Sequence, residues 1–302
     1  MEQYLGIDVG GTNVKMGIVD ASNGRISNFY SHDTASWRTS GHFIDRLGDA
    51  IALQLVEYPE VKRVGIGVPG LTNRARTTLI EITAIPEIDG IQIVPDLKKR
   101  FPDHDFFLEN DANAAALGEY YFGEDKLPED YIFVTLGTGI GGAAIIDKKV
   151  FKGGGGNAME PGHVPSKNGK VLERNIGKKE LLDMANEMRA AYTGTTQLPA
   201  DGTISTTGLV AAASAGDELA KQIFWEMGYL LGEGLVSMVR ILDITTILIG
   251  GGISASFEFI LPAINDRLEC WLTPYYLKTI SIKRATLAND AGLLGAASLC
   301  FD

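Results

Sequence analysis

The hydrophobic positions of the chain begin as three short apolar runs separated by glycine turns. The runs are Tyr4–Ile7, Val14–Val19 and Arg25–Tyr30, with Gly10-Gly11 and Asn23-Gly24 between them. Apolar runs of this length, bounded by glycine and asparagine, are typical of strands joined as hairpins. The chain is therefore predicted to start with three consecutive strands.

The pattern then changes to a helical one. Apolar residues recur at Phe43, Leu47, Ile51 and Leu55, a spacing that predicts a helix over His42–Val56. Further along, the sequence predicts two strands, a short helix between them and an alanine-rich helix after the second strand: Val64–Val68, Asp89–Arg100, Asp105–Leu108 and Asn110 to about Tyr121. The expected order is βββαβαβ followed by a helix.

The second half of the chain repeats the opening hairpin. Tyr131–Asp147 aligns with Tyr4–Asp20 without a gap, so that Gly137 matches Gly10 while Thr135 replaces Asp8. Later elements are a long helix, a strand, a helix capped by Ser256, a last strand and a last helix: Glu218–Leu242, Thr245–Ile249, Ser256–Leu268, Thr279–Arg284 and Ala288–Leu299. The pattern predicts an α/β fold of two duplicated mixed-sheet domains with a cleft between them.

Composition narrows the class of protein. A length of 302 residues favours two domains, and a net charge of −11 without a run of Lys or Arg argues against general nucleic-acid binding. Two cysteines, Cys270 and Cys300, exclude a disulfide framework. No apolar stretch is long enough to span a membrane and no signal peptide precedes the first strand, so a cytoplasmic protein is expected.

The two glycine turns are candidate phosphate-binding sites. Turns without side chains let backbone N–H groups approach an anion, and a carboxylate at the end of a strand can hold hydrated Mg²⁺ beside it. The first turn offers Asp8, Gly10, Gly11, Thr12, Asn13 and Lys15, and the second offers Gly137, Thr138 and Gly139. A glycine turn alone also suits any tight hairpin, but Asp8 and the second copy favour a shared polyphosphate ligand.

Three further segments carry polar groups at places suited to chemistry. Asn110 and Asp111 stand where a strand meets a helix, so that Asn110 is expected to cap the helix and Asp111 to accept a proton from a substrate hydroxyl. The Glu160-Pro161-Gly162-His163 turn, with Glu173 as a weaker candidate, suits neighbouring hydroxyls of a polyol. Gly250, Gly251 and Gly252 follow a strand and suit a purine and its ribose.

These segments together resemble the ROK family of bacterial sugar kinases, within the superfamily of actin, hexokinase and Hsp70-like ATPases. The resemblance covers nearly the whole chain and rests on DVGGTNVK, ENDANAAALGE, LGTGIGG, EPGH, IGGGIS and AGLLGAA. It implies ATP-dependent phosphorylation of a hexose, with glucose at the 6-hydroxyl as first choice and an N-acetylhexosamine or another hexose as the alternative. The family is often dimeric, which makes a homodimer one option, but no interface is legible in the sequence.

The resemblance implies a role for each candidate residue. Asp111 would be the catalytic base, and Asn110, Glu160, His163 and Glu173 would contact sugar hydroxyls. Asp8 would act through Mg²⁺, and Gly11, Thr12 and Thr138 would contact ATP phosphates. The expected lobes are 1–113 with 288–302, and 114–287.

Two segments depart from the family pattern. The family's zinc-binding cysteines after E-x-G-H are replaced by Ser166–Glu173, which contains no cysteine, so no zinc is expected. Pro86-Glu87-Ile88 stands where the family has Pro-Asn-Leu near the sugar, which leaves the identity of the hexose open.

Two other functions compete with a kinase. A sugar-responsive repressor of the same family would need a helix-turn-helix before Asp8, where the sequence leaves no room. An actin-like or chaperone-like ATPase would turn over ATP without a sugar, and the Glu160–His163 turn argues against it.

Overall fold

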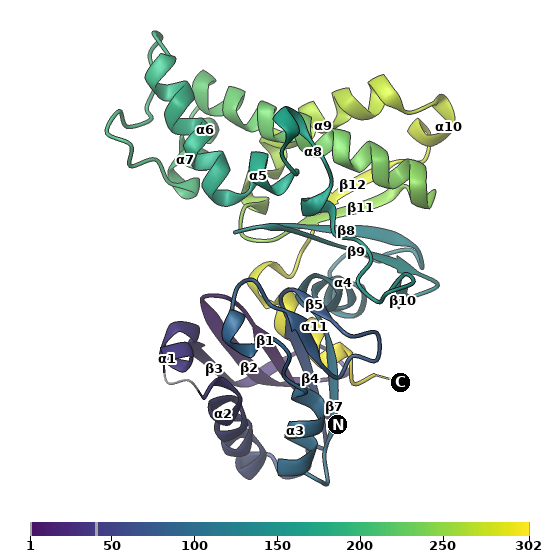
Figure 1. Cartoon of the computed structure of the whole chain (residues 1–302). Coiled ribbons are helices and arrows are strands. Elements are labelled where there is room, and N and C mark those ends of the chain that lie inside the picture. Colours follow the sequence, from purple (N-terminus) through teal and green to yellow (C-terminus); the bar gives the residue numbers. More distant parts are fainter. Residues whose placement is uncertain (1, 40–41, 302) are drawn as a thin grey trace. The chain divides into compact units, whose positions relative to one another are not determined.

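The computed structural model describes residues 2–39 and 42–301, and the chain folds as two compact units (Figure 1). The first unit comprises Met1–Leu127, Ala143–Ala158 and Thr286–Asp302, and the second comprises Pro128–Gly142 and Met159–Ala285. Among the described residues, no helix is both long and apolar enough to cross a membrane.

The strands and helices of the first half lie where the apolar pattern predicts them. The strands are β1 Gln3–Val9, β2 Asn13–Asp20, β3 Ile26–Asp33, β4 Arg63–Val68, β5 Leu71–Thr72, β6 Leu79–Glu81 and β7 Asp105–Asn110. The helices are α1 Thr34–Thr39, α2 Phe43–Glu57, η1 Pro86–Ile88, α3 Ile93–Arg100 and α4 Asp111–Phe122. The predicted order is confirmed, with α1, the short β5–β6 pair and η1 added to it.

The second half also follows its prediction. Its strands are β8 Tyr131–Leu136, β9 Ile140–Ile146, β10 Lys149–Val150, β11 Thr246–Gly250 and β12 Ser281–Arg284. Its helices are η2 Pro161–His163, η3 Lys167–Gly169, α5 Glu173–Ile176, α6 Lys178–Ala191, α7 Thr206–Ser214, α8 Glu218–Leu242, η4 Ser254–Ser256, α9 Phe257–Trp271, α10 Pro274–Leu277, η5 Ala288–Asp290 and α11 Ala291–Ser298.

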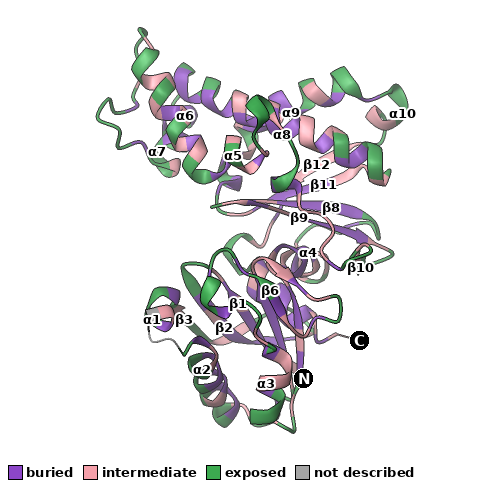
Figure 2. Cartoon of the chain, viewed as in Figure 1, coloured by how far each residue is buried: buried purple, intermediate pink, exposed green. Residues whose placement is uncertain are grey.

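The two five-stranded sheets confirm the predicted duplication. Their orders are β3-β2-β1-β4-β7 and β10-β9-β8-β11-β12. The central strand of each sheet, β1 or β8, is the first strand of its copy and pairs in parallel with β4 or β11. The outer pairs β2–β3 and β9–β10 are antiparallel, and the pairs β4–β7 and β11–β12 are parallel. Figure 2 shows β1 and β8, the central strands, as mainly buried.

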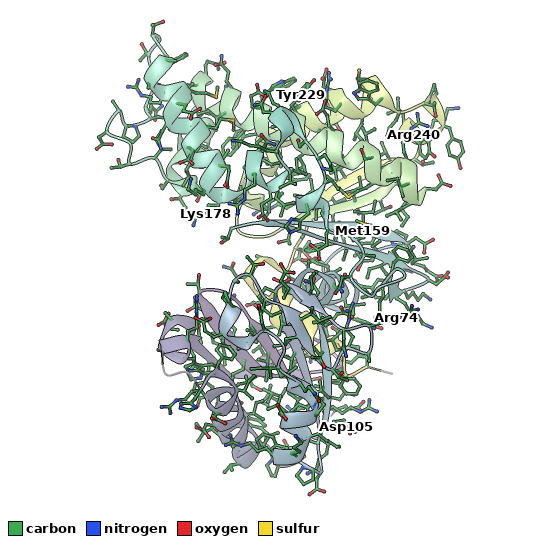
Figure 3. The ribbon with its side chains drawn as sticks, in the orientation of Figure 1. Arg74, Asp105, Met159, Lys178, Tyr229 and Arg240 are labelled. Atoms are coloured by element: carbon green, nitrogen blue, oxygen red, sulfur yellow. The ribbon has the colours of Figure 1, made fainter. Side chains whose placement is uncertain are left out.

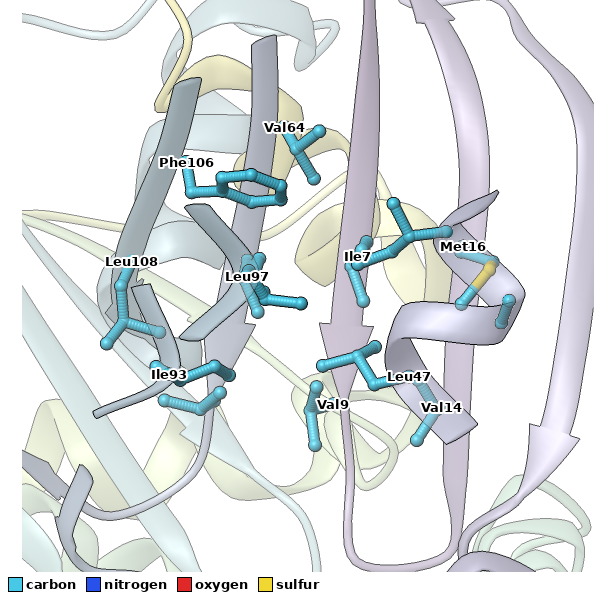
Figure 4. Packing of buried hydrophobic residues seen from close by; sticks show 14 of the residues in the cluster. Ile7, Val9, Val14, Met16, Leu47, Val64, Ile93, Leu97, Phe106 and Leu108 are labelled. Atoms are coloured by element: carbon cyan, nitrogen blue, oxygen red, sulfur yellow. The ribbon is translucent and has the colours of Figure 1, made fainter. Parts of the chain in front are cut away.

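The first sheet has a large hydrophobic core on one face. Alternate residues of β1, namely Leu5, Ile7 and Val9, belong to this core together with residues of α2 and α3 (Figure 4). Burying each such aliphatic side chain contributes about 1.5–3 kcal/mol. The strand period of two therefore assigns Leu5, Ile7 and Val9 to this core and leaves the intervening residues for the other face.

On the other face, α11 packs on a row of glycines. Gly6 of β1 pairs with Gly17 of β2 and with Gly65 of β4, so the three lie side by side across the sheet. A Cβ atom added to Gly65 would lie 1.7 Å from the carbonyl oxygen of Ala296, and one added to Gly6 would lie 2.5 Å from that of Leu293. The backbone of α11 can approach the sheet this closely only because these positions lack side chains.

One predicted helix cap is wrong. Ser256 precedes α9, but its hydroxyl donates to the carbonyl oxygen of Ile253 at 2.7 Å and makes no cap bond to the helix. A capping serine needs extended backbone, whereas Ser256 has φ −83° and ψ 2°. The reason is that the 3₁₀ turn η4 runs directly into α9.

Candidate active site

Asp8 lies on the face of β1 that packs against α11. It follows Gly6 by two residues, so both side-chain positions point to the same face. A Cβ atom added to Gly292 of α11 would lie 2.6 Å from Oδ2 of Asp8, which places the carboxylate against the backbone of that helix. Burial raises the pKa of Asp8, and the positive charge of Lys15 on the neighbouring strand opposes the rise.

The first glycine turn is fixed by bonds at its base. The amide of Gly10 donates to the carbonyl oxygen of Asn13 at 2.9 Å, and the hydroxyl of Thr34 donates to the carbonyl oxygen of Gly10 at 2.7 Å. Gly11, Thr12 and Asn13 are exposed at the tip. The ammonium group of Lys15 donates to the carbonyl oxygen of Asn289 at 2.9 Å. The turn therefore has a rigid base and an accessible tip, as an anion site requires.

Asn110 caps α4, as predicted, and Asp111 is the first residue of the helix. The side-chain oxygen of Asn110 accepts from the amides of Ala112 and Asn113, and its Nδ2 donates to the carbonyl oxygen of Gly70 at 3.2 Å. These three bonds lock the amide in place, so the second N–H of Nδ2 is the group with which Asn110 can reach a ligand. Asp111 accepts from the amide of Ala112 at 2.9 Å, which holds its carboxylate in the first helical turn.

Glu109 forms a buried ion pair beneath this segment that the sequence did not reveal. Its Oε1 lies 2.7 Å from a guanidinium nitrogen of Arg76, and both side chains are almost fully buried. The same oxygen accepts from the amide of Asn110 at 2.9 Å and from the side-chain amide of Asn113 at 3.0 Å. Breaking one partner of a buried pair costs about 3–5 kcal/mol, so Glu109 fixes the backbone from which Asn110 and Asp111 project.

Arg76 also ties the glycine run after β10 to the same cluster. Its guanidinium donates to the carbonyl oxygen of Gly156 and to the hydroxyl of Thr72, both at 2.6 Å. The guanidinium of Arg74, labelled in Figure 3, donates to the carbonyl oxygen of Gly154 at 2.6 Å. The 72–76 segment thus connects the helix start at Asn110 with the glycine run. The only signal for this cluster in the sequence is the position of Glu109 directly before Asn110 and Asp111.

In the second unit, the predicted phosphate turn and Glu173 lie in contact. The amide of Ile140, just after Gly139, donates to Oε2 of Glu173 at 2.9 Å. The carbonyl oxygen of Leu136, just before the turn, accepts from the amide of Ile253 at 2.9 Å. The structure therefore brings the second glycine turn together with Glu173 and with the segment that follows Gly250–Gly252.

In the Glu160–His163 turn, Pro161–His163 form the short 3₁₀ segment η2, which packs on the start of β9. A Cβ atom added to Gly162 would lie 2.3 Å from the carbonyl oxygen of Ile140, so only glycine allows this approach. Burial raises the pKa of Glu160, the nearby charge of Glu173 adds to the rise, and His163 opposes it. His163 is exposed, so that a half-buried carboxyl and an accessible imidazole stand in one turn.

The described part of the chain contains no group of three or more His, Cys, Asp or Glu side chains arranged to hold a metal ion. That no zinc binds stays a prediction. Asp8 supplies one oxygen donor of the kind Mg²⁺ prefers, and a single carboxylate suits a magnesium ion whose other ligands are waters and phosphates.

Comparison with known proteins places this geometry in a family. The ROK family model matches residues 4–302. The glucokinase of Streptomyces coelicolor is 31% identical, over 98% of this chain and 96% of its own length. A crystal structure of a Cytophaga hutchinsonii protein is 40% identical, covering 99% of this chain and all of its own, with a TM-score of 0.94.

A second solved structure carries ligands. The ROK family glucokinase of Streptomyces griseus, in complex with glucose and AMPPNP, is 30% identical, with 98% of each chain covered and a TM-score of 0.78. The predicted fold class, a duplicated α/β fold of the actin-like ATPase type, is thereby confirmed. The chain belongs to the ROK family, as an ATP-dependent sugar kinase.

Proposed function

We propose that the sugar is a hexose, with glucose as first choice, and that ATP phosphorylates its 6-hydroxyl. The observation that carries the proposal is Asp111, whose carboxylate is held in the first turn of α4 beside the capping residue Asn110. A fixed carboxylate at a helix start can orient a hydroxyl and take its proton as the phosphoryl group transfers. Asp111 is the proposed base.

The sugar hydroxyls are assigned to four side chains. Asn110 offers the second N–H of its locked amide, while Glu160, His163 and Glu173 offer a carboxyl with a raised pKa, an accessible imidazole and a second carboxylate. A polyol presents donors and acceptors in alternation, so this mixed set suits it. The departure at Pro86-Glu87-Ile88, which forms η1, makes an N-acetylhexosamine the main alternative outcome of a substrate test.

The nucleotide is assigned to the glycine segments. We assign the phosphates to the first turn with Asn13 and Lys15, and to Gly137, Thr138 and Gly139 of the second turn. The adenosine is assigned to Gly250–Gly252, which end β11 and begin the following loop. Mg²⁺ held through Asp8 would neutralise charge on the phosphates. The cytoplasmic location stays a prediction.

Gly292→Ala tests the role of Asp8. The added methyl would lie 2.6–2.9 Å from the Asp8 carboxylate and would displace it. Overpacking costs about 1–3 kcal/mol, so the Mg²⁺ concentration for half-maximal turnover is expected to rise about tenfold, which corresponds to about 1.4 kcal/mol. Titrating MgCl₂ at saturating ATP and sugar measures it. Gly154→Ala is the control, since nothing lies within 4 Å of its added methyl, and an unchanged requirement in Gly292→Ala would reject the role.

A coupled assay of ATP turnover over a panel of sugars tests the function itself. The panel contains glucose, mannose, fructose, N-acetylglucosamine and N-acetylmannosamine, with a sample that contains no sugar. The expected result is turnover that depends on sugar and is fastest with glucose. Faster turnover with an N-acetylhexosamine would correct the substrate, and equal turnover without any sugar would contradict a kinase in favour of a free ATPase.

A further inference from the structure

The second glycine turn is closed by the amide of Gly137, which donates to the carbonyl oxygen of Gly139 at 2.9 Å, and other segments of the same unit bond to the residues on either side of it. The residues that flank it are Leu136 at the end of β8 and Ile140 at the start of β9. The amide of Ile140 donates to Oε2 of Glu173, and the carbonyl oxygen of Leu136 accepts from the amide of Ile253, both at 2.9 Å. Two other segments of the same unit therefore satisfy the backbone groups on either side of the turn.

The fit between Glu173 and the turn is close. A Cβ atom added to Gly139 would lie 2.2 Å from Oε2 of Glu173, so the carboxylate rests where a side chain would otherwise stand. The residues that follow Glu173 hold the same turn, because the amide of Lys178, labelled in Figure 3, donates to the carbonyl oxygen of Gly137 at 3.2 Å. The segment 173–178 is thus hydrogen-bonded to the backbone at both ends of the Gly137–Gly139 turn.

The turn and the carboxylate have different assignments in the proposed function, on which this inference rests. Gly137–Gly139 is assigned to ATP phosphates and Glu173 to the sugar. We propose that Glu173 is also a positioning residue for the nucleotide: its Oε2 holds the amide of Ile140 and so fixes the phosphate turn, while Oε1 serves a sugar hydroxyl. Hydrogen bonds to a charged acceptor are among the strongest in proteins, so the turn loses its set shape when this acceptor is removed.

Two opposite effects on the nucleotide follow from the carboxylate, and substitutions separate them. As an acceptor, Glu173 orders the turn and favours phosphate binding; as an anion, it repels phosphate. Glu173→Gln keeps an acceptor for the amide of Ile140 and removes the charge. Glu173→Ala removes both. If ordering of the turn dominates, only Glu173→Ala weakens nucleotide binding.

The test measures the dissociation constant of Mg·AMPPNP by calorimetry in the absence of sugar. We expect Glu173→Ala to weaken binding about tenfold or more and Glu173→Gln to stay within about threefold of the wild type. Asp183→Ala is the matched control, because Asp183 lies in α6 of the same unit and its exposed carboxylate pairs with Lys179; its nucleotide affinity should not change. Unchanged or tighter binding in Glu173→Ala overturns the proposal.

A second measurement keeps the test valid if Glu173→Ala fails to fold. Hydrogen exchange of the peptide that contains Ile140 should be faster in Glu173→Asp, whose carboxylate is one methylene shorter, than in the wild type, and near wild type in Glu173→Gln. Equal exchange in all three overturns the proposal. The sugar panel is independent of both measurements: nucleotide weakening without any sugar-dependent turnover would reject the proposed function and leave the positioning role standing.

Discussion

An Asp111→Asn enzyme is expected to turn over at least about 100-fold more slowly than the wild type while its affinity for sugar stays largely intact. Asparagine has the shape of aspartate and can accept the bond that the amide of Ala112 now makes to Asp111. It cannot take a proton from a hydroxyl. The loss should therefore fall on the chemical step, because the start of α4 is held by Asn110 and by the buried Glu109.

Turnover and sugar binding are measured separately to check this. Steady-state assays with ATP and the preferred sugar give kcat, and calorimetry with the sugar alone gives its dissociation constant. Asp105→Asn is the control, because Asp105 begins the same strand, β7, and its carboxylate forms an exposed ion pair with Lys98. Asp105→Asn should keep normal kcat. Near-normal turnover in Asp111→Asn would remove Asp111 from the role of base.

The parts of the fold that depend on local chemistry could be predicted from the sequence. Apolar runs between glycine turns predicted the strands. The match of Gly10 with Gly137 predicted a duplicated domain, and the structure shows that the two sheets also share one strand order. Asn110 was predicted as a cap because its side chain acts within three residues. Ser256 was wrongly predicted as a cap because only its residue type was considered. It is the last residue of the 3₁₀ turn η4, so it lacks the extended backbone that a cap needs.

The contacts that set the site depend on segments far apart in sequence. Arg76 forms a buried ion pair with Glu109, and Gly292 leaves space for the carboxylate of Asp8. Neither partner follows from spacing, since nothing in a single sequence says which distant residues the sheet brings together. The contact of Glu173 with Ile140 is of the same kind. The candidate residues could therefore be selected from the sequence, whereas the contacts that hold them could not.

The second large effect is expected from the glycines around α11. Gly295 of α11 packs on α4, where an added Cβ atom would lie 1.8 Å from the carbonyl oxygen of Ala114. On its other side, the same helix rests on the glycine row, with Gly65 closest. Because backbone faces backbone on both sides, no side chain can move to make room. Gly295→Ala is expected to lower the free energy of unfolding by about 3 kcal/mol or more.

Thermal unfolding followed by circular dichroism measures this loss as a fall of about 5–10 °C in the midpoint. Gly234→Ala in α8 is the matched control, since its added methyl meets only the ends of two flexible side chains, Leu172 and Met238. Alanine has the better helix propensity by about 1 kcal/mol, so this variant should be neutral or slightly more stable. A midpoint for Gly295→Ala as high as that of Gly234→Ala would show that α11 and α4 can separate at little cost. Strands β1 and β7 alone would then position Asp8 and Asp111. The reason is that α11, which packs between β1 and α4, would not fix the distance between these two elements.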